Sequence, residues 1–127
     1  MTGTEHQRQS EAPSPDSILD QMLSTVEASA LRAMAHRNEA IESLMLAGIL
    51  ADVFNEPARA IKSFTLALEM DSGNAMVLLL RASVFRDVGN RENELKDLRT
   101  CLPLLTGHSK LLATERIKSL EKEETKE

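Results

Sequence analysis

The residues whose side chains could perform chemistry are three histidines and one cysteine. His6 lies in a polar N-terminal segment, His36 near the end of a predicted helix and His108 in a predicted linker, so they form no local metal-ligand set or acid–base pair. Cys101 falls at a position that we expect to be buried, where a packing role is more common than nucleophilic chemistry. The glycine patterns of P-loop and Rossmann nucleotide sites are also missing. We therefore expect no enzymatic activity, no cofactor and no metal.

The composition also restricts the classes of molecule that the chain is expected to bind. The net charge is -5, and the chain contains three Phe but no Trp or Tyr, so it has little to offer phosphates or stacked bases and we expect no nucleic acid as a direct ligand. No apolar run approaches the roughly 20 residues of a membrane-spanning helix, which argues against membrane insertion. The polar N-terminus lacks the apolar segment of a signal peptide, and a single Cys excludes an internal disulfide, so we expect a soluble, intracellular, cytoplasmic protein.

The positions that could bind a partner depend on the helices that carry them, and the chain predicts an all-α protein. Residues 1–13 are polar and are expected to form a disordered tail. Residues 14–122 are expected to form a single helical domain, and 123–127 a frayed charged end. Ser14 before Pro15 fits either a helix N-cap or a phosphorylation site, and both interpretations stay open.

Apolar spacing and turn residues set the expected helices. The first runs from Pro15 to about His36, where Asn38 offers a cap for a separate helix. Pro103 lacks an amide hydrogen and should kink or stop a helix near Leu102. The other expected helices are Glu39–Val53, Pro57–Met70, Ala75–Val88, one from about Arg91, and Ser109–Glu121.

Two of these helical hairpins are related by a shift of 34 residues. Residues 41–74 superpose on 75–108, so that Asn55 falls on Gly89 and Phe64 on Leu98. A period of this length is typical of stacked helical hairpins.

The repeat resembles the tetratricopeptide repeat, whose 34-residue unit carries W-x2-L-G-x2-Y followed by A-x3-F. The first copy has Leu44-x2-Ala47-Gly48-x2-Ala51 and then Ala60-x3-Phe64; the second has Leu78-x2-Arg81-Ala82-x2-Phe85. The resemblance covers about half of the chain. It implies that small residues allow close helix contacts while larger ones fill the gaps between hairpins. The implied packing residues are Leu44, Gly48, Ala60, Phe64, Ala67, Leu78, Ala82, Phe85 and Leu98.

The resemblance implies a short right-handed α-solenoid of antiparallel helical hairpins. An N-terminal flanking helix and a C-terminal capping helix at 109–121 would cover the two ends. Two residues depart from the pattern. Glu94 replaces the small residue that corresponds to Ala60, and we expect its carboxylate to reach water or a partner. Arg116 takes the place of Gly48 and Ala82, where it should not fit a close helix contact, so the stack should end there.

The resemblance also implies a concave groove lined by the first helix of each hairpin. The groove positions are Met45, Ile49, Met76, Leu79, Leu80, Ser83 and Arg86. Most are apolar, and flexible methionines suit a partner helix or extended segment. We therefore expect a noncatalytic protein–protein interaction adaptor or assembly subunit. Two alternatives stay open: the flanking helices cover the groove, or the chain is a structural subunit that completes its core by self-association or within a larger complex.

Overall fold

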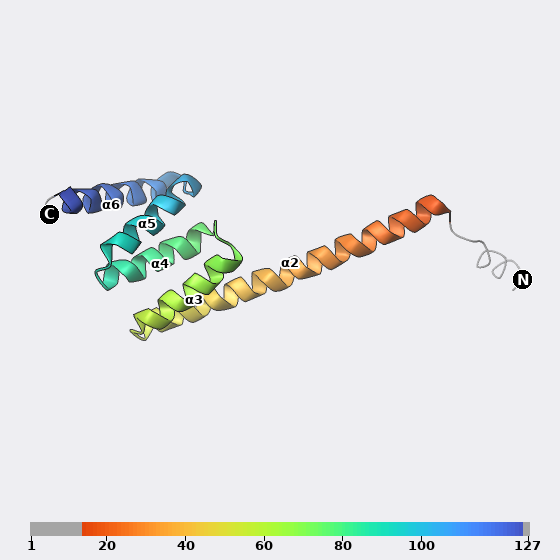
Figure 1. Ribbon diagram of the computed structural model, residues 1–127, viewed down its shortest axis with the longest axis horizontal. Helices are drawn as coiled ribbons and strands as arrows, with labels where there is room; N and C mark the ends of the chain where they lie inside the picture. The colour runs from red at the N-terminus through yellow and green to blue at the C-terminus, as the bar shows by residue number, and fades with distance from the viewer. Residues whose placement is uncertain (1–13, 126–127) are drawn as a thin grey trace, which may run out of the picture. The chain divides into compact units, whose positions relative to one another are not determined.

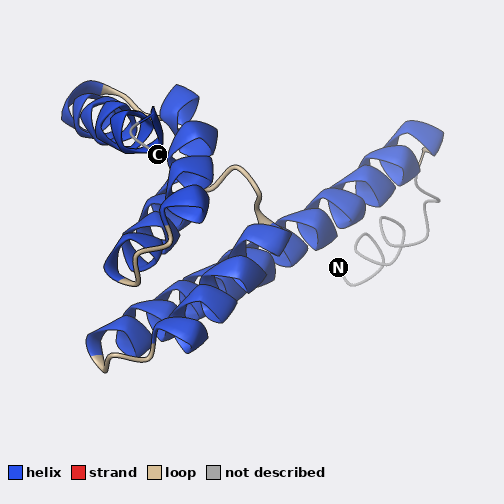
Figure 2. Cartoon of the chain, turned by 60° about the vertical axis from the view of Figure 1, so that its left-hand side comes forward, coloured by secondary structure: helices blue, strands red, loops and turns tan. Residues whose placement is uncertain are grey.

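The computed structural model describes residues 14–125, and this part of the chain contains α-helices, one short 3-10 turn and no strand (Figures 1 and 2). The all-α prediction is confirmed at this level. The elements are α2 (Pro15–Val53), α3 (Pro57–Met70), α4 (Ala75–Asp87), α5 (Arg91–Cys101), η1 (Leu102–Leu104) and α6 (Gly107–Thr125). The expected tail at 1–13 and the residues 126–127 lie outside the described part.

The chain divides into two compact units, one ending at His36 and one beginning at Arg37. This boundary falls inside the range 14–122 that was expected to form one domain. It also falls inside a single helix, because α2 continues from Pro15 to Val53. The prediction of separate helices on either side of Asn38 is therefore wrong. The local sequence contains neither Pro nor Gly, and an Asn inside a helix costs only a fraction of 1 kcal/mol relative to Ala.

The described part of the first unit consists of Ser14 and the N-terminal part of α2. Its Ser14 side-chain oxygen accepts a hydrogen bond of 3.2 Å from the Ser17 amide, which is the geometry of a helix N-cap. The apolar side chains from Ile18 to Met34 are all exposed, so this stretch has no core of its own. The predicted N-terminal helix is therefore present, and its apolar side chains are exposed.

The second unit contains the remaining helices, which follow one another in antiparallel order with short loops (Figures 1 and 2). Helix α4 packs against both α3 and α5, and α6 packs against α5. The side chain of Arg37 donates a hydrogen bond to the carbonyl of Met70 at the end of α3. The buried core of this unit comprises Ile41, Ala60, Phe64, Ala67, Leu68, Val77, Leu78, Ala82, Val84, Leu95, Leu98, Cys101, Leu105, Ala113, Ile117 and Leu120.

The turn after α2 and the turn after α4 have the same hydrogen bonds. Asn55 and Gly89 have positive φ angles of 59° and 78°, the left-handed conformation that ends many helices. In the first turn the Glu56 amide bonds to the Ala51 carbonyl at 2.8 Å and the Asn55 amide to that of Asp52. In the second turn the corresponding donors are Asn90, bonded to the Phe85 carbonyl at 2.8 Å, and Gly89, bonded to that of Arg86. Residues that align at a shift of 34 thus adopt the same local structure.

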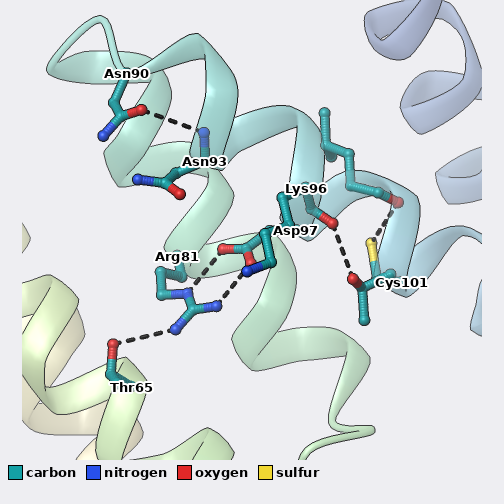
Figure 3. A network of polar contacts seen from close by, with 9 residues as sticks. Thr65, Arg81, Asn90, Asn93, Lys96, Asp97 and Cys101 are labelled. Carbon is teal, nitrogen blue, oxygen red and sulfur yellow. Dashed lines mark hydrogen bonds and ion pairs between the residues drawn. The ribbon is translucent and has the colours of Figure 1, made fainter.

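Asparagine side chains cap the N-termini of α4 and α5. Asn74 accepts from the Val77 amide and Asn90 from the Asn93 amide, each at 3.2 Å. Figure 3 shows the second of these caps. At the other end of α5, Pro103 lies in the 3-10 turn η1, and α5 stops at Cys101. The predicted end near Leu102 is confirmed.

Helix α6 is longer than the expected capping helix at 109–121. It begins at Gly107 and continues through Thr125, where the sequence predicted a frayed end from 123. Ion pairs to α5 explain part of the extension, because Arg99 contacts Glu121 and Arg91 contacts Glu123, both at 3.1 Å.

Candidate protein-binding site

A pocket of about 240 Å³ lies between α4 and α6. This volume is below the about 300–1,000 Å³ that small-molecule sites commonly measure. Buried residues of α5 form its floor, and the exposed Leu112 of α6 and Arg86 of α4 stand at its sides. Its lining residues are Leu79, Ala82, Ser83, Arg86, Glu94, Leu98, Ser109, Leu112, Ala113 and Arg116.

An ion pair between α5 and α6 supports the floor of this pocket. The Arg116 guanidinium donates to both carboxylate oxygens of Glu94, at 2.7 and 2.9 Å. The Glu94 side chain is 3% exposed and that of Arg116 26%, so the carboxylate is enclosed while the guanidinium reaches the pocket surface. The side-chain hydrogen bond to Glu94 raises the pKa of Arg116 above its ordinary value. The expectation that the Glu94 carboxylate reaches water or a partner is therefore wrong.

A second ion pair joins α5 to its other neighbours. Arg81 of α4 donates to both oxygens of Asp97 of α5, at 2.8 and 2.7 Å, and to the Thr65 hydroxyl of α3 at 3.1 Å (Figure 3). The guanidinium also lies 5.7 Å from the centre of the Phe85 ring. Bidentate pairing satisfies the buried carboxylate and fixes the orientation of both side chains. Arg81 thereby joins three consecutive helices.

The two pairs position α5 despite its few apolar side chains. Glu94 and Asp97 are each 2% exposed and lie three residues apart, so they share one side of the helix. One points to Arg116 of α6 and the other to Arg81 of α4. Because bidentate contacts have strict geometry, α5 holds the pocket walls α4 and α6 at a defined separation.

The seven predicted groove residues differ in their surroundings, and Leu79 belongs to two of the three groups they form. Leu79, Ser83 and Arg86 line the α4–α6 pocket. Met45, Leu79 and Leu80 are half-buried and pack against the core of the second unit. Ile49 of α2 and Met76 of α4 are exposed, Met76 to 58%. The pocket thus brings together only part of the predicted set.

The predicted packing residues lie in the core or beside it. Leu44 is half-buried against the core, and the other eight are buried. At Gly48 a β-carbon would lie only 2.4 Å from the Phe64 ring, so α2 approaches α3 at a distance that excludes any larger side chain.

Sequence reasoning missed Ser109, Leu112 and Arg116 as parts of the site. The available signal was the combination of Glu94 and Arg116: each charge replaces a small residue of the repeat pattern, and the two charges are opposite. A Glu and an Arg at two such positions can neutralise each other's charge if the helices that carry them are neighbours.

Of the candidate chemical residues, Cys101 and two of the three histidines lie in the described part of the chain. Cys101 is fully buried, its thiol donates to the Leu98 carbonyl at 3.5 Å, and burial raises its pKa. No group of three or more His, Cys, Asp and Glu side chains between residues 14 and 125 is arranged to hold a metal ion. His6 lies outside this range. No helix of the described part is both long and apolar enough to cross a membrane.

Comparison of the chain with protein-family models, with curated proteins and with solved structures finds no match.

Proposed function

We propose that this chain is a noncatalytic adaptor whose second unit is a short tetratricopeptide-like stack of helical hairpins. The pocket between α4 and α6 is the observation that carries the proposal. The repeated turn geometry after α2 and α4, and the close approach of Gly48 to Phe64, support the relationship to that family. The pocket lies between α4, which is the first helix of the second hairpin, and α6, which is the helix after that hairpin. In the tetratricopeptide family, partners bind along the first helices of successive hairpins.

The partner is a protein segment that inserts an apolar side chain between Leu79 and Leu112. Leu112 is 57% exposed and gains most from being covered, because apolar burial is worth about 25 cal/mol per Å². The adjoining Ser83 and Ser109 offer hydrogen bonds to the segment's backbone. Met76 lies three residues before Leu79 on α4 and is 58% exposed, so it offers the segment a second apolar contact.

The charge at the pocket favours an acidic neighbour to the inserted residue. Arg86 is exposed and, within residues 14–125, forms no ion pair. Arg116 is already neutralised by Glu94. A carboxylate on the partner would therefore meet Arg86, which sets orientation and association rate more than affinity.

Affinity capture with two matched variants tests this proposal. Leu111 and Leu112 are adjacent on α6 and equally exposed at 57%, but only Leu112 lines the pocket. Proteins captured by the wild-type chain should be retained by Leu111→Asp and lost with Leu112→Asp. Circular dichroism checks that both variants keep their helices. If the two variants retain the same proteins, the α4–α6 pocket is not the binding site.

A further inference from the structure

Arg116 keeps hydrogen-bond donors for a ligand of the α4–α6 pocket, although Glu94 neutralises its charge. A guanidinium has five N–H groups in one plane. The Nε group and one N–H of Nη2 donate to the two oxygens of Glu94, and no other residue between 14 and 125 accepts a hydrogen bond from Arg116. Three of the five N–H groups are therefore left to bind a ligand. The side chain is 26% exposed and lines the pocket, so part of the guanidinium faces this space.

Arg86 brings a second guanidinium to the same pocket. On α4, Leu79, Ser83 and Arg86 follow one another at spacings of four and three residues, so they share one face of the helix. On α6, Leu112 and Arg116 share a face in the same way, four residues apart. Because α5 runs opposite to both of these helices, α4 and α6 run in the same direction (Figure 1). A leucine therefore precedes an arginine along each wall of the pocket.

The charges of the lining indicate the charge of the ligand. Of the described residues that line the pocket, Arg86 and Arg116 are positive and Glu94 is negative, which gives a net charge of +1. One carboxylate from a partner balances this charge. A phosphoryl group, which carries about −1.5 to −2 at pH 7, would leave an excess of negative charge beside the enclosed Glu94 carboxylate. The exposed hydroxyls of Ser83 and Ser109 add donors without adding charge.

We propose that Arg86 and Arg116 together hold one carboxylate of the partner segment, beside the apolar side chain that enters the pocket. This inference rests on the proposed adaptor function and assigns an aspartate or glutamate to its partner. Arg86 supplies the uncompensated positive charge, and Arg116 supplies N–H donors of fixed direction. Glu94 is a positioning residue, because its two hydrogen bonds fix the plane of the Arg116 guanidinium.

A double-mutant cycle between Arg116 and the carboxylate of a peptide tests the proposal. The probe is a pocket-binding peptide with one Asp beside its apolar anchor, compared with the same peptide carrying Asn instead. In the wild type, Asn should weaken binding about tenfold at low salt, because hydrogen bonds to a charged acceptor are the stronger ones. Arg116→Lys keeps a cation opposite Glu94 but loses the planar donors, so Asn should weaken binding only about threefold. Arg86→Gln should reduce the difference between the peptides in the same way.

Arg99→Lys is the matched control. Arg99 also donates across α5 and α6 to a carboxylate, that of Glu121, but does not line the pocket. The difference between the two peptides should stay about tenfold in this variant. Urea unfolding checks that Arg116→Lys is folded, and Arg86→Gln changes an exposed side chain, so it tests the carboxylate contact without altering the core.

The possible results separate this inference from the adaptor function. An Asp-to-Asn difference of the same size in the wild type and Arg116→Lys overturns the role of Arg116, and one that persists in Arg86→Gln overturns the shared carboxylate. In both cases binding that is lost with Leu112→Asp would still support the pocket. A peptide with phosphoserine that binds more tightly than the Asp peptide overturns the preference for a single negative charge. Equal binding of the Asp peptide to the wild type and Leu112→Asp contradicts the adaptor function itself, and this inference with it.

Discussion

Glu94 and Arg116 show how two charged residues, each unfavourable alone in a helix contact, can form one favourable ion pair. Each is bulky and charged at a position where the repeat pattern has a small residue, yet their side chains meet at 2.7 Å across α5 and α6. A buried carboxylate costs several kcal/mol unless a cation pairs with it. The cost of losing the pair should therefore depend on which partner is removed.

A double-mutant cycle measures this dependence. Arg116→Ala strands the enclosed carboxylate and should reduce the free energy of unfolding by about 2–4 kcal/mol, whereas Glu94→Ala leaves a guanidinium that can reach water and should cost about 1–2 kcal/mol. The variant with both changes has two small residues at the contact and should be more stable than the sum predicts by at least about 1 kcal/mol. Urea unfolding gives all three values. Strictly additive costs would show that the two side chains do not act together.

Gly48 should be intolerant of even one extra carbon. Alanine raises helix propensity by about 1 kcal/mol, but its β-carbon would lie 2.4 Å from the buried Phe64 ring. Overpacking of this kind costs about 1–3 kcal/mol, so Gly48→Ala should be destabilising on balance. Adding Phe64→Leu should remove the clash and reduce the effect of Gly48→Ala, as measured by thermal unfolding. A Gly48→Ala chain more stable than the wild type would mean that α2 and α3 are farther apart.

Cys101 should make stability depend on alkaline pH. Burial raises its pKa in the folded chain above the ordinary value of 9.0. Above that pH the unfolded thiol loses its proton while the folded thiol retains it, so the unfolded state binds fewer protons and stability falls. The free energy of unfolding of the wild type should decline more steeply above pH 9 than that of Cys101→Ala. Parallel declines would argue that the thiol is more accessible than its full burial indicates.

The sequence indicated the packing residues better than the polar ones. Small and aromatic residues at a spacing of 34 identify positions such as Gly48 and Phe64, because close helix packing restricts side-chain size. The ion pair of Arg81 and Asp97 joins residues 16 positions apart on different helices, and nothing local indicates that they meet. Charge pairing across helices depends on the assembled fold, so single-sequence patterns reveal it poorly.

The helices α3, α4 and α5 follow the sequence closely because strong local signals bound them. Pro57 begins α3, Asn74 caps α4 and Pro103 follows α5. The opposite case is α2, where Asn38 provided only a weak signal and the helix runs through it. The C-terminal end of α6 was underestimated for a similar reason, since its support comes from ion pairs with α5 rather than from its own apolar residues.

The boundary within α2 makes a prediction about truncation. Because the second unit begins at Arg37 and contains the buried core, a chain of residues 37–127 should fold without the first unit. It should unfold in one cooperative thermal transition, with a midpoint within a few degrees of that of the longer chain's core. The control is a chain beginning at Ser43, which removes the buried Ile41 and should lose several degrees. Loss of cooperativity in the 37–127 chain would place the boundary elsewhere.

At the scale of the whole molecule, each unit has its own apolar surface: exposed side chains along the first unit's helix and the α4–α6 pocket in the second unit. We propose that the pocket of the second unit binds an apolar segment of another protein. The composition of the chain argued against nucleic acid as a ligand. The repeat predicted a groove along the first helix of each hairpin. The pocket itself required the structure, because its walls come from α4 and from an α6 whose Leu112 carried no distinctive sequence signal.

Selection from a library of displayed peptides tests the central claim most directly. The second unit's pocket should enrich peptides with an apolar residue next to Asp or Glu, and Arg86→Glu should shift that preference towards Lys or Arg. The decisive measurement is the dissociation constant of an enriched peptide for the two adjacent α6 variants. The account predicts at least about tenfold weaker binding to Leu112→Asp and unchanged binding to Leu111→Asp. Equal affinities for both variants would contradict it.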